Sequence, residues 1–198
     1  MNFSKGYKVS NPQNIKESFS VENDHILINL SVEKYQKVMT ELCKLLQEPL
    51  FFIIEVPCDE LKEKELRKSN YDPLHKDVYY LDEIDNKAAE TILENMGDML
   101  INDGLSAFGF GCLEVRAEVM KGKYNTLTVF ADDLKPYIDV LKSNEIEQVD
   151  SIVTAEDLFT RENPGICQKY VDKDNRDIFV HKDFFVKMGA YLDHTEEN

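Results

Sequence analysis

Few side chains in this chain of 198 residues could act as nucleophiles, proton carriers or metal ligands: four cysteines and four histidines. The cysteines are far apart and form no Cys-x-x-Cys or Cys-x-His pattern: Cys43, Cys58, Cys112 and Cys167. The histidines lack the spacing of a His-Glu-x-x-His or His-x-His zinc site: His25, His75, His181 and His194. We therefore predict four reduced thiols that fill the core, no metal site and no cofactor.

One combination of these residues would support covalent catalysis. His181 would act as a base oriented by Asp183, and Cys112 or Cys167 would be the nucleophile. The spacing does not favour this arrangement over chance. Ser106 is no better candidate, because phenylalanine replaces the final glycine of a Gly-x-Ser-x-Gly motif. The sequence therefore assigns no catalytic residue.

Two short runs resemble ligand-binding loops only in part. The run 108–111, Phe-Gly-Phe-Gly, lacks the Gly-Lys-Ser/Thr of a phosphate loop, and Glu114 breaks the Gly-x-Gly-x-x-Gly pattern. It better fits a strand whose backbone another element approaches closely. The run 172–177 begins like a calcium loop, but Asp177 and Asp183 replace the required glycine and glutamate. We predict a polar turn there.

Charge is the dominant feature of the composition: 38 acidic residues against 23 basic ones give a formal net charge of −15. Such a surface repels nucleic-acid phosphates and anionic membranes, and it attracts basic proteins or cations. The acidity belongs to the folded body, because residues 51–100 carry seven more acids than bases whereas residues 1–50 are balanced. The expected partner is a basic protein, with nucleic acid and membrane excluded.

The densest acidic segment surrounds one amphipathic helix, expected over residues 85–103. Its polar side carries acids at positions i, i+4 and i+8, with no lysine between them, and further acids precede it near the favourable end of the helix dipole. This side is either a solvated face or a docking surface for a cationic partner. The candidate partner-binding residues are Asp82, Glu83, Asp85, Glu90, Glu94 and Asp98.

Periodicity along the chain predicts interspersed helices and strands. Apolar residues recur at helical spacing in four segments, and a fifth, shorter helix is highly charged: 32–48, 85–103, 134–142, 182–192 and 59–68. Strands are expected where apolar runs or alternation occur: 25–30, 50–56, 77–81, 113–119, 125–131 and 149–153. Residues 1–24 are expected to form a loosely ordered arm, and residues 193–198 a frayed tail.

The hairpin expected from 113–119 and 125–131 rules out a purely parallel sheet. We predict an α+β fold, with one domain over residues 25–192 and a mixed, mostly antiparallel sheet packed against several helices. The longest apolar run, 50–54, is far shorter than the ~20 residues of a membrane span. The N-terminus also lacks the apolar stretch of a secretory signal, so we expect a cytoplasmic protein.

Three stretches carry a family resemblance: 100–111 (LINDGLSAFGFG), 121–130 (KGKYNTLTVF) and 152–165 (IVTAEDLFTRENPG). Together they resemble a family of small, uncharacterised cytoplasmic proteins from Gram-positive bacteria, some of which are similar to the immunity partners of secreted polymorphic toxins. The resemblance covers roughly residues 75–190 and leaves the N-terminal portion unmatched. Its motifs are turns, caps and strand starts, so it implies an immunity function and carries over no catalytic residue.

Three functions stay open at this point. The first is a non-enzymatic acidic binding domain, of the immunity or inhibitor type, that neutralises a basic toxin through complementary fields. The second is a small hydrolase or transferase whose site lies in a deep pocket near the Gly109–Gly111 strand. The third is a dimeric structural or regulatory domain that associates through a sheet edge. The absence of a catalytic motif places the binding domain first.

Overall fold

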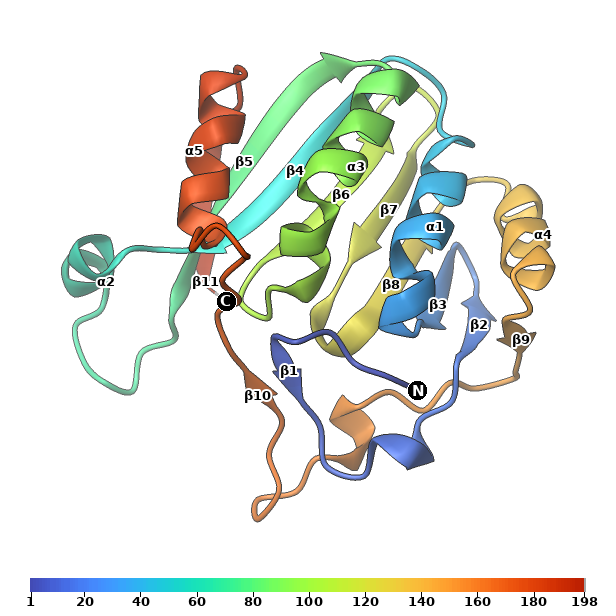
Figure 1. Ribbon diagram of the computed structural model, residues 1–198, viewed down its shortest axis with the longest axis horizontal. Coiled ribbons are helices and arrows are strands. Elements are labelled where there is room, and N and C mark those ends of the chain that lie inside the picture. The colour runs from blue at the N-terminus through green and yellow to red at the C-terminus, as the bar shows by residue number, and fades with distance from the viewer. Residues whose placement is uncertain (198) are drawn as a thin grey trace.

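Nine strands form one sheet in the computed structural model, which describes residues 1–197 (Figure 1). They lie in the order β11-β5-β4-β6-β7-β8-β3-β2-β9. Their bounds are β2 Ser18–Glu22, β3 His25–Asn29, β4 Leu50–Pro57, β5 His75–Ile84, β6 Ala107–Cys112, β7 Ala117–Lys121, β8 Thr126–Phe130, β9 Glu147–Gln148 and β11 Tyr191–Glu197. Strands β1 (Tyr7–Lys8) and β10 (Ile166–Cys167) pair in a second, small sheet. The main sheet is antiparallel except where β9 joins β2, so the predicted α+β class with a mixed, mostly antiparallel sheet is confirmed.

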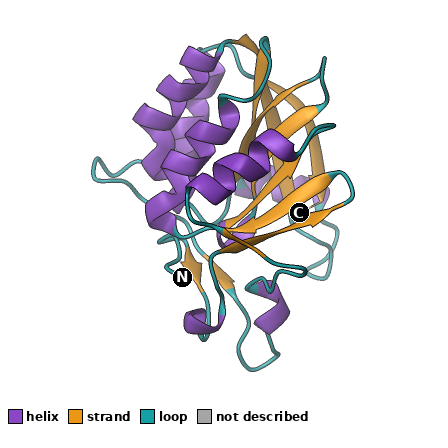
Figure 2. Cartoon of the chain, turned by 90° about the vertical axis from the view of Figure 1, so that its right-hand side faces the viewer, coloured by secondary structure: helices purple, strands orange, loops and turns teal. Residues whose placement is uncertain are grey.

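Five α-helices accompany the sheet: α1 Val32–Cys43, α2 Glu60–Leu66, α3 Asn86–Asn102, α4 Lys135–Ser143 and α5 Ile178–Lys187. Helices α1, α3, α4 and α5 gather on one side of the sheet, as Figure 2 shows in profile. Helix α3 packs between α1 and α5. No helix within residues 1–197 combines the length and the apolarity that a membrane crossing needs.

The core lies between the helices and the sheet, and β4 runs through its centre. Phe52 and Ile54 point toward the helices and are fully buried, whereas Phe51 and Ile53 point to the other side and are nearly buried as well. A strand that is covered on both faces needs a continuous apolar run and not an alternating one. The prediction of a buried central strand over 50–56 is therefore confirmed.

The N-terminal segment differs from the loosely ordered arm that we expected. Ser18–Glu22 forms β2 within the main sheet, and Ile15 and Phe19 are buried. Gly6 crosses Gly104 so closely that a Cβ on either residue would collide with the other's backbone. The sequence does not predict this order, because single apolar residues among polar neighbours give no periodic signal.

The C-terminal segment also differs from the prediction. Helix α5 starts four residues earlier than the expected 182–192, where the Asp177 side chain accepts from the backbone N–H of Phe179 at 3.1 Å. Gly189, with φ of +111°, then reverses the chain into β11. The expected frayed tail 193–198 is part of this edge strand up to Glu197, and Asn198 lies outside the described residues.

Two predicted strands differ from the structure. The alternating segment 113–119 begins in a turn, where Leu113 is 82% exposed, and its strand β7 starts only at Ala117. The predicted hairpin is present, because β7 pairs antiparallel with β8. The expected strand 149–153 lies in an irregular segment after β9. Alternation alone does not distinguish a strand from a turn whose residues happen to alternate.

Candidate docking face

One face of the main sheet carries no helix layer, and we call it the open face. The apolar residues Phe51, Ile53 and Val78 form a small cluster there, with Tyr80 and Met120 packed against them. These side chains lie on the opposite side of the sheet from the main core.

Strand register sets the pattern of side chains on the open face. One row runs across six strands: Glu22, His25, Phe130, Glu118, Gly111 and Phe51. The adjacent row is Leu27, Thr128, Met120, Gly109, Ile53, Tyr80 and Tyr191. Directly paired residues are within contact distance across neighbouring strands. In the first row, Glu118 therefore lies between Phe130 and Phe51.

The two glycines of β6 let large side chains lie flat across the centre of the open face. A Cβ on Gly111 would meet the ring of Phe51, and a Cβ on Gly109 would meet the sulfur of Met120. The run 108–111 thus serves close packing, as the sequence indicated. The ring of Phe51 and the side chain of Met120 therefore cover the two glycines themselves.

Glu118 is a half-buried carboxylate without a compensating charge. Within residues 1–197 it forms no ion pair and no side-chain hydrogen bond. Burial raises the pKa of its carboxyl above the usual range, and the negative charge of Glu55 raises it further. Half-buried charges are normally paired, because losing water is costly for an ion. Residues 1–197 therefore supply no cation to balance the charge of Glu118.

A cavity of about 420 Å³ opens beside Glu118. Two aromatic rings line it, those of Phe51 and Phe130, and so do two further acids, Asp24 and Asp132. Arg116 is its single basic lining residue. Aromatic faces and carboxylates both attract ammonium and guanidinium groups. The cavity suits the side chain of an arginine or a lysine.

Further acids and aromatic rings lie at the β11 side of the open face. The rings of Tyr80 and Tyr191 stack with centroids 6.5 Å apart, and the Tyr191 hydroxyl donates to Asp82 at 2.7 Å. Lys76 bridges the carboxylates of Glu55 and Glu196 at 2.6 and 3.1 Å. This lysine is already paired twice, so acids outnumber bases across the whole open face.

The six residues predicted to bind a partner are not on one surface. Asp82 lies on the open face, whereas the stripe of Glu90, Glu94 and Asp98 lies on α3 in the helix layer. Glu83 is exposed near the end of β5, and the Asp85 carboxylate caps α3 by accepting from the Ala88 N–H at 2.7 Å.

The α3 stripe is also less free than its sequence indicates. Lys44 from α1 pairs with Glu90 at 2.9 Å, and the Tyr170 hydroxyl donates to Asp98 at 2.9 Å. Helix α1 and the segment before α5 thus supply the partners that the helix itself lacks. Glu94, between them, is exposed.

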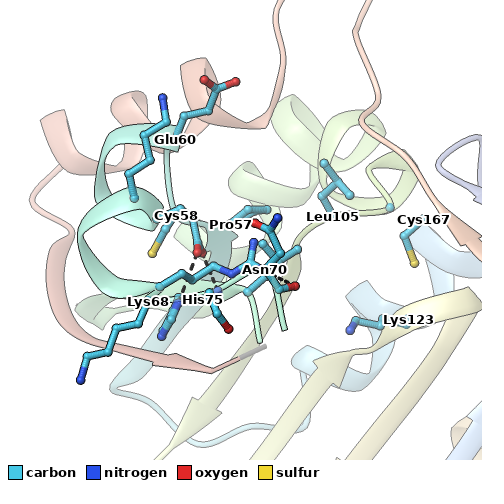
Figure 3. Close-up of a pocket in the computed structure, with 15 residues that line it drawn as sticks. Pro57, Cys58, Glu60, Lys68, Asn70, His75, Leu105, Lys123 and Cys167 are labelled. Atoms are coloured by element: carbon cyan, nitrogen blue, oxygen red, sulfur yellow. Dashed lines mark hydrogen bonds and ion pairs between the residues drawn. The ribbon is translucent and has the colours of Figure 1, made fainter. Parts of the chain in front are cut away.

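A second cavity, of about 760 Å³, lies between α2 and the loops beside Leu105 (Figure 3). Cys58 and Cys167 are on opposite sides of it, and the Cys58 thiol donates to Asp77 at 3.3 Å. Burial and the neighbouring Asp77 raise the pKa of Cys58 to about 12, so its thiol stays protonated at neutral pH. His75 is held by Glu63, 3.3 Å from its Nδ1. Cys58 is therefore not an activated nucleophile in this cavity.

The remaining histidine candidate is part of a structural contact. His181 is 4% exposed, and its Nε2 lies 3.2 Å from Asp172 and not beside Asp183, which pairs with Lys182. Asp172 also binds the Arg176 guanidinium and backbone N–H groups of the 172–176 turn. The predicted polar turn is confirmed, and His181 fastens it to α5.

Lys121 of β7 is a charged residue whose side chain is fully buried on the core side of the sheet. Its Nζ reaches the Tyr7 hydroxyl at 2.9 Å and the backbone carbonyls of Asp103 and Ser106 at 3.2 and 3.1 Å. Burial lowers the pKa of the amine to about 8. Three acceptors satisfy its three donors, which indicates a tie between the N-terminal segment and the end of α3.

Within residues 1–197 no group of three or more histidine, cysteine, aspartate or glutamate side chains is arranged to hold a metal ion. Searches against protein-family models, curated proteins and solved structures give no match to this chain. The site therefore has to be argued from its own geometry. In the sequence, Glu118 alternates with the apolar Ala117 and Val119, which predicts that it faces water. Its aromatic neighbours follow only from the cross-strand register.

Proposed function

We propose that this protein is a non-enzymatic binding domain whose open face receives a basic protein. The observation that carries the proposal is Glu118, which is half-buried between Phe51 and Phe130 without a cation. A guanidinium or ammonium group from a partner would restore the charge balance that this carboxylate lacks.

The wider charge distribution supports the same class of partner. A net charge of −15 accelerates encounter with a basic surface and repels nucleic acid. Aromatic residues at the face, such as Tyr80, Tyr191 and Phe130, are the kind that dominate protein interfaces. An inhibitor of a basic toxin, for example a nuclease, is the most specific form of this proposal.

A comparison of two equivalent substitutions tests the proposal. Wild type, Glu118→Gln and Glu94→Gln are immobilised, and bound proteins are eluted from a lysate of the source cells by steps from low to high salt. Both substitutions remove one acid, but only Glu118 lies on the open face. We expect a basic protein that binds wild type and Glu94→Gln and is lost from Glu118→Gln.

The affinity of the captured protein is then measured by calorimetry. Removing the charge of Glu118 should weaken binding by about tenfold to a hundredfold, since one partner of a desolvated ion pair is lost. Equal affinity for wild type and Glu118→Gln, with loss in Glu94→Gln, would move the docking surface to α3. Binding that is insensitive to both changes and to salt would contradict the proposal.

A further inference from the structure

Helix α5 is apolar around most of its circumference although it lies at the outer end of the helix layer (Figure 1). Ile178, His181 and Phe185 face inward and are buried. On the outward side Val180 is 40% and Phe184 37% exposed, and Met188, just after the helix, is 54% exposed. A helix that is apolar on all sides is normally covered on all sides.

An apolar groove continues this surface toward α3. It has a volume of about 400 Å³, and Ala88, Ile92 and Met96 of α3 line it together with Met188. Exposed single apolar residues are common, whereas a contiguous stripe beside a groove marks an interaction site. The α5 stripe and the groove form one apolar surface, on the side of the sheet away from Glu118.

We infer that this surface binds a second copy of the chain, with the two α5 helices packed antiparallel about a two-fold axis at the level of residue 185, beside the exposed ring of Phe184. The charges on α5 identify the occupant. Asp183 and Lys187 are exposed and one helical turn apart. In an antiparallel pair, Asp183 of each copy faces Lys187 of the other, so both contacts are attractive. A two-fold interface must be self-complementary in this way.

The local charge balance also separates this surface from the open face. Asp85 and Lys87 line the groove, and α5 carries Asp183, which pairs with Lys182 of the same helix, together with Lys187, so these charges nearly balance in a chain of net charge −15. A second acidic copy would be repelled from the open face but not from here. The dimer therefore leaves the proposed docking face free, and its existence does not depend on the proposed function.

Sedimentation velocity of the full chain, from micromolar to several hundred micromolar, tests the inference. Wild type should shift from monomer to dimer with concentration. Phe184→Glu should stay monomeric, because it places a carboxylate from each copy beside the two-fold axis. Leu61→Glu, an equivalent change at a residue of α2 that is 73% exposed, should dimerise like wild type. Circular dichroism and thermal melting show whether each variant is folded.

A charge swap gives the decisive result. Asp183→Lys should weaken dimerisation by about tenfold or more, since two attractive contacts become repulsive. The double variant Asp183→Lys with Lys187→Asp should restore it, because the reversed pair is again complementary. A wild-type chain that stays monomeric throughout, a swap that fails to restore the dimer, or a Leu61→Glu effect as large as that of Phe184→Glu would overturn the inference.

Discussion

Strand β7 places two buried charges three residues apart on opposite faces of the sheet, and the structure treats them differently. Lys121 faces the core and donates to three oxygen acceptors. Glu118 faces the open side and has no partner among residues 1–197. A charge whose hydrogen-bonding capacity is met within the chain serves the fold, whereas a half-buried charge without a partner is available to a ligand. The contrast separates structural from functional charge on a single strand.

Removal of Lys121 should give the largest effect on stability. Lys121→Ala deletes a buried side chain and leaves the Tyr7 hydroxyl and two carbonyls without their donor, so we expect a loss of about 2–4 kcal/mol in the free energy of unfolding. Urea denaturation measures it. A loss no greater than that of Glu118→Ala would show that the two charges do not differ as described.

The pH dependence of stability should identify the Lys121 amine directly. Its pKa is about 8 in the folded protein and near 10.5 in the unfolded chain, so the unfolded state binds more protons between these values and stability rises with pH. Relative to Lys121→Met, wild type should gain about 2 kcal/mol between pH 7.5 and 9.5. The difference between the two proteins cancels the titration of other groups, and parallel pH profiles would contradict the assignment.

Neutralising Glu118 should have a smaller effect, of the opposite sign. The pKa of its carboxyl is raised in the folded protein, so its ionisation costs stability, and this cost appears as the pH rises through the folded pKa. We expect Glu118→Gln to be as stable as wild type at pH 4 and more stable by a few tenths of a kcal/mol at pH 7. Thermal melting at both pH values measures this, and a destabilised variant at pH 7 would indicate a structural role.

The sequence predicted the fold class and the long apolar elements because these depend on local periodicity. The buried run 50–56 and the amphipathic helix 85–103 each carry the signal within one segment. It did not predict β2 or β11, whose positions depend on pairing with distant strands. Strand β11 is an edge strand of mixed composition, and β2 is flanked on its outer side only by the two-residue strand β9, so neither carries a strong local strand signal.

The sequence predicted that the site would be acidic, but it did not predict where the site lies. The excess of acids indicated a basic partner, and the α3 stripe was the only acidic cluster that a helical period could reveal. Lys44, which neutralises Glu90, and Tyr170, which donates to Asp98, come from other parts of the chain. The open-face row requires the register of six strands, from Glu22 to Phe51, which no local pattern encodes.

The most direct test is an NMR titration of the Glu118 carboxyl carbon, in the free protein and with N-acetyl-arginine amide at millimolar concentration. The account predicts a pKa above the usual glutamate value in the free protein and a fall on addition of the arginine compound, with chemical-shift changes at Gly111 and Phe130. The Glu94 carboxyl serves as the control and should move much less. An ordinary Glu118 pKa, or equal responses at Glu118 and Glu94, would contradict a cation-binding open face.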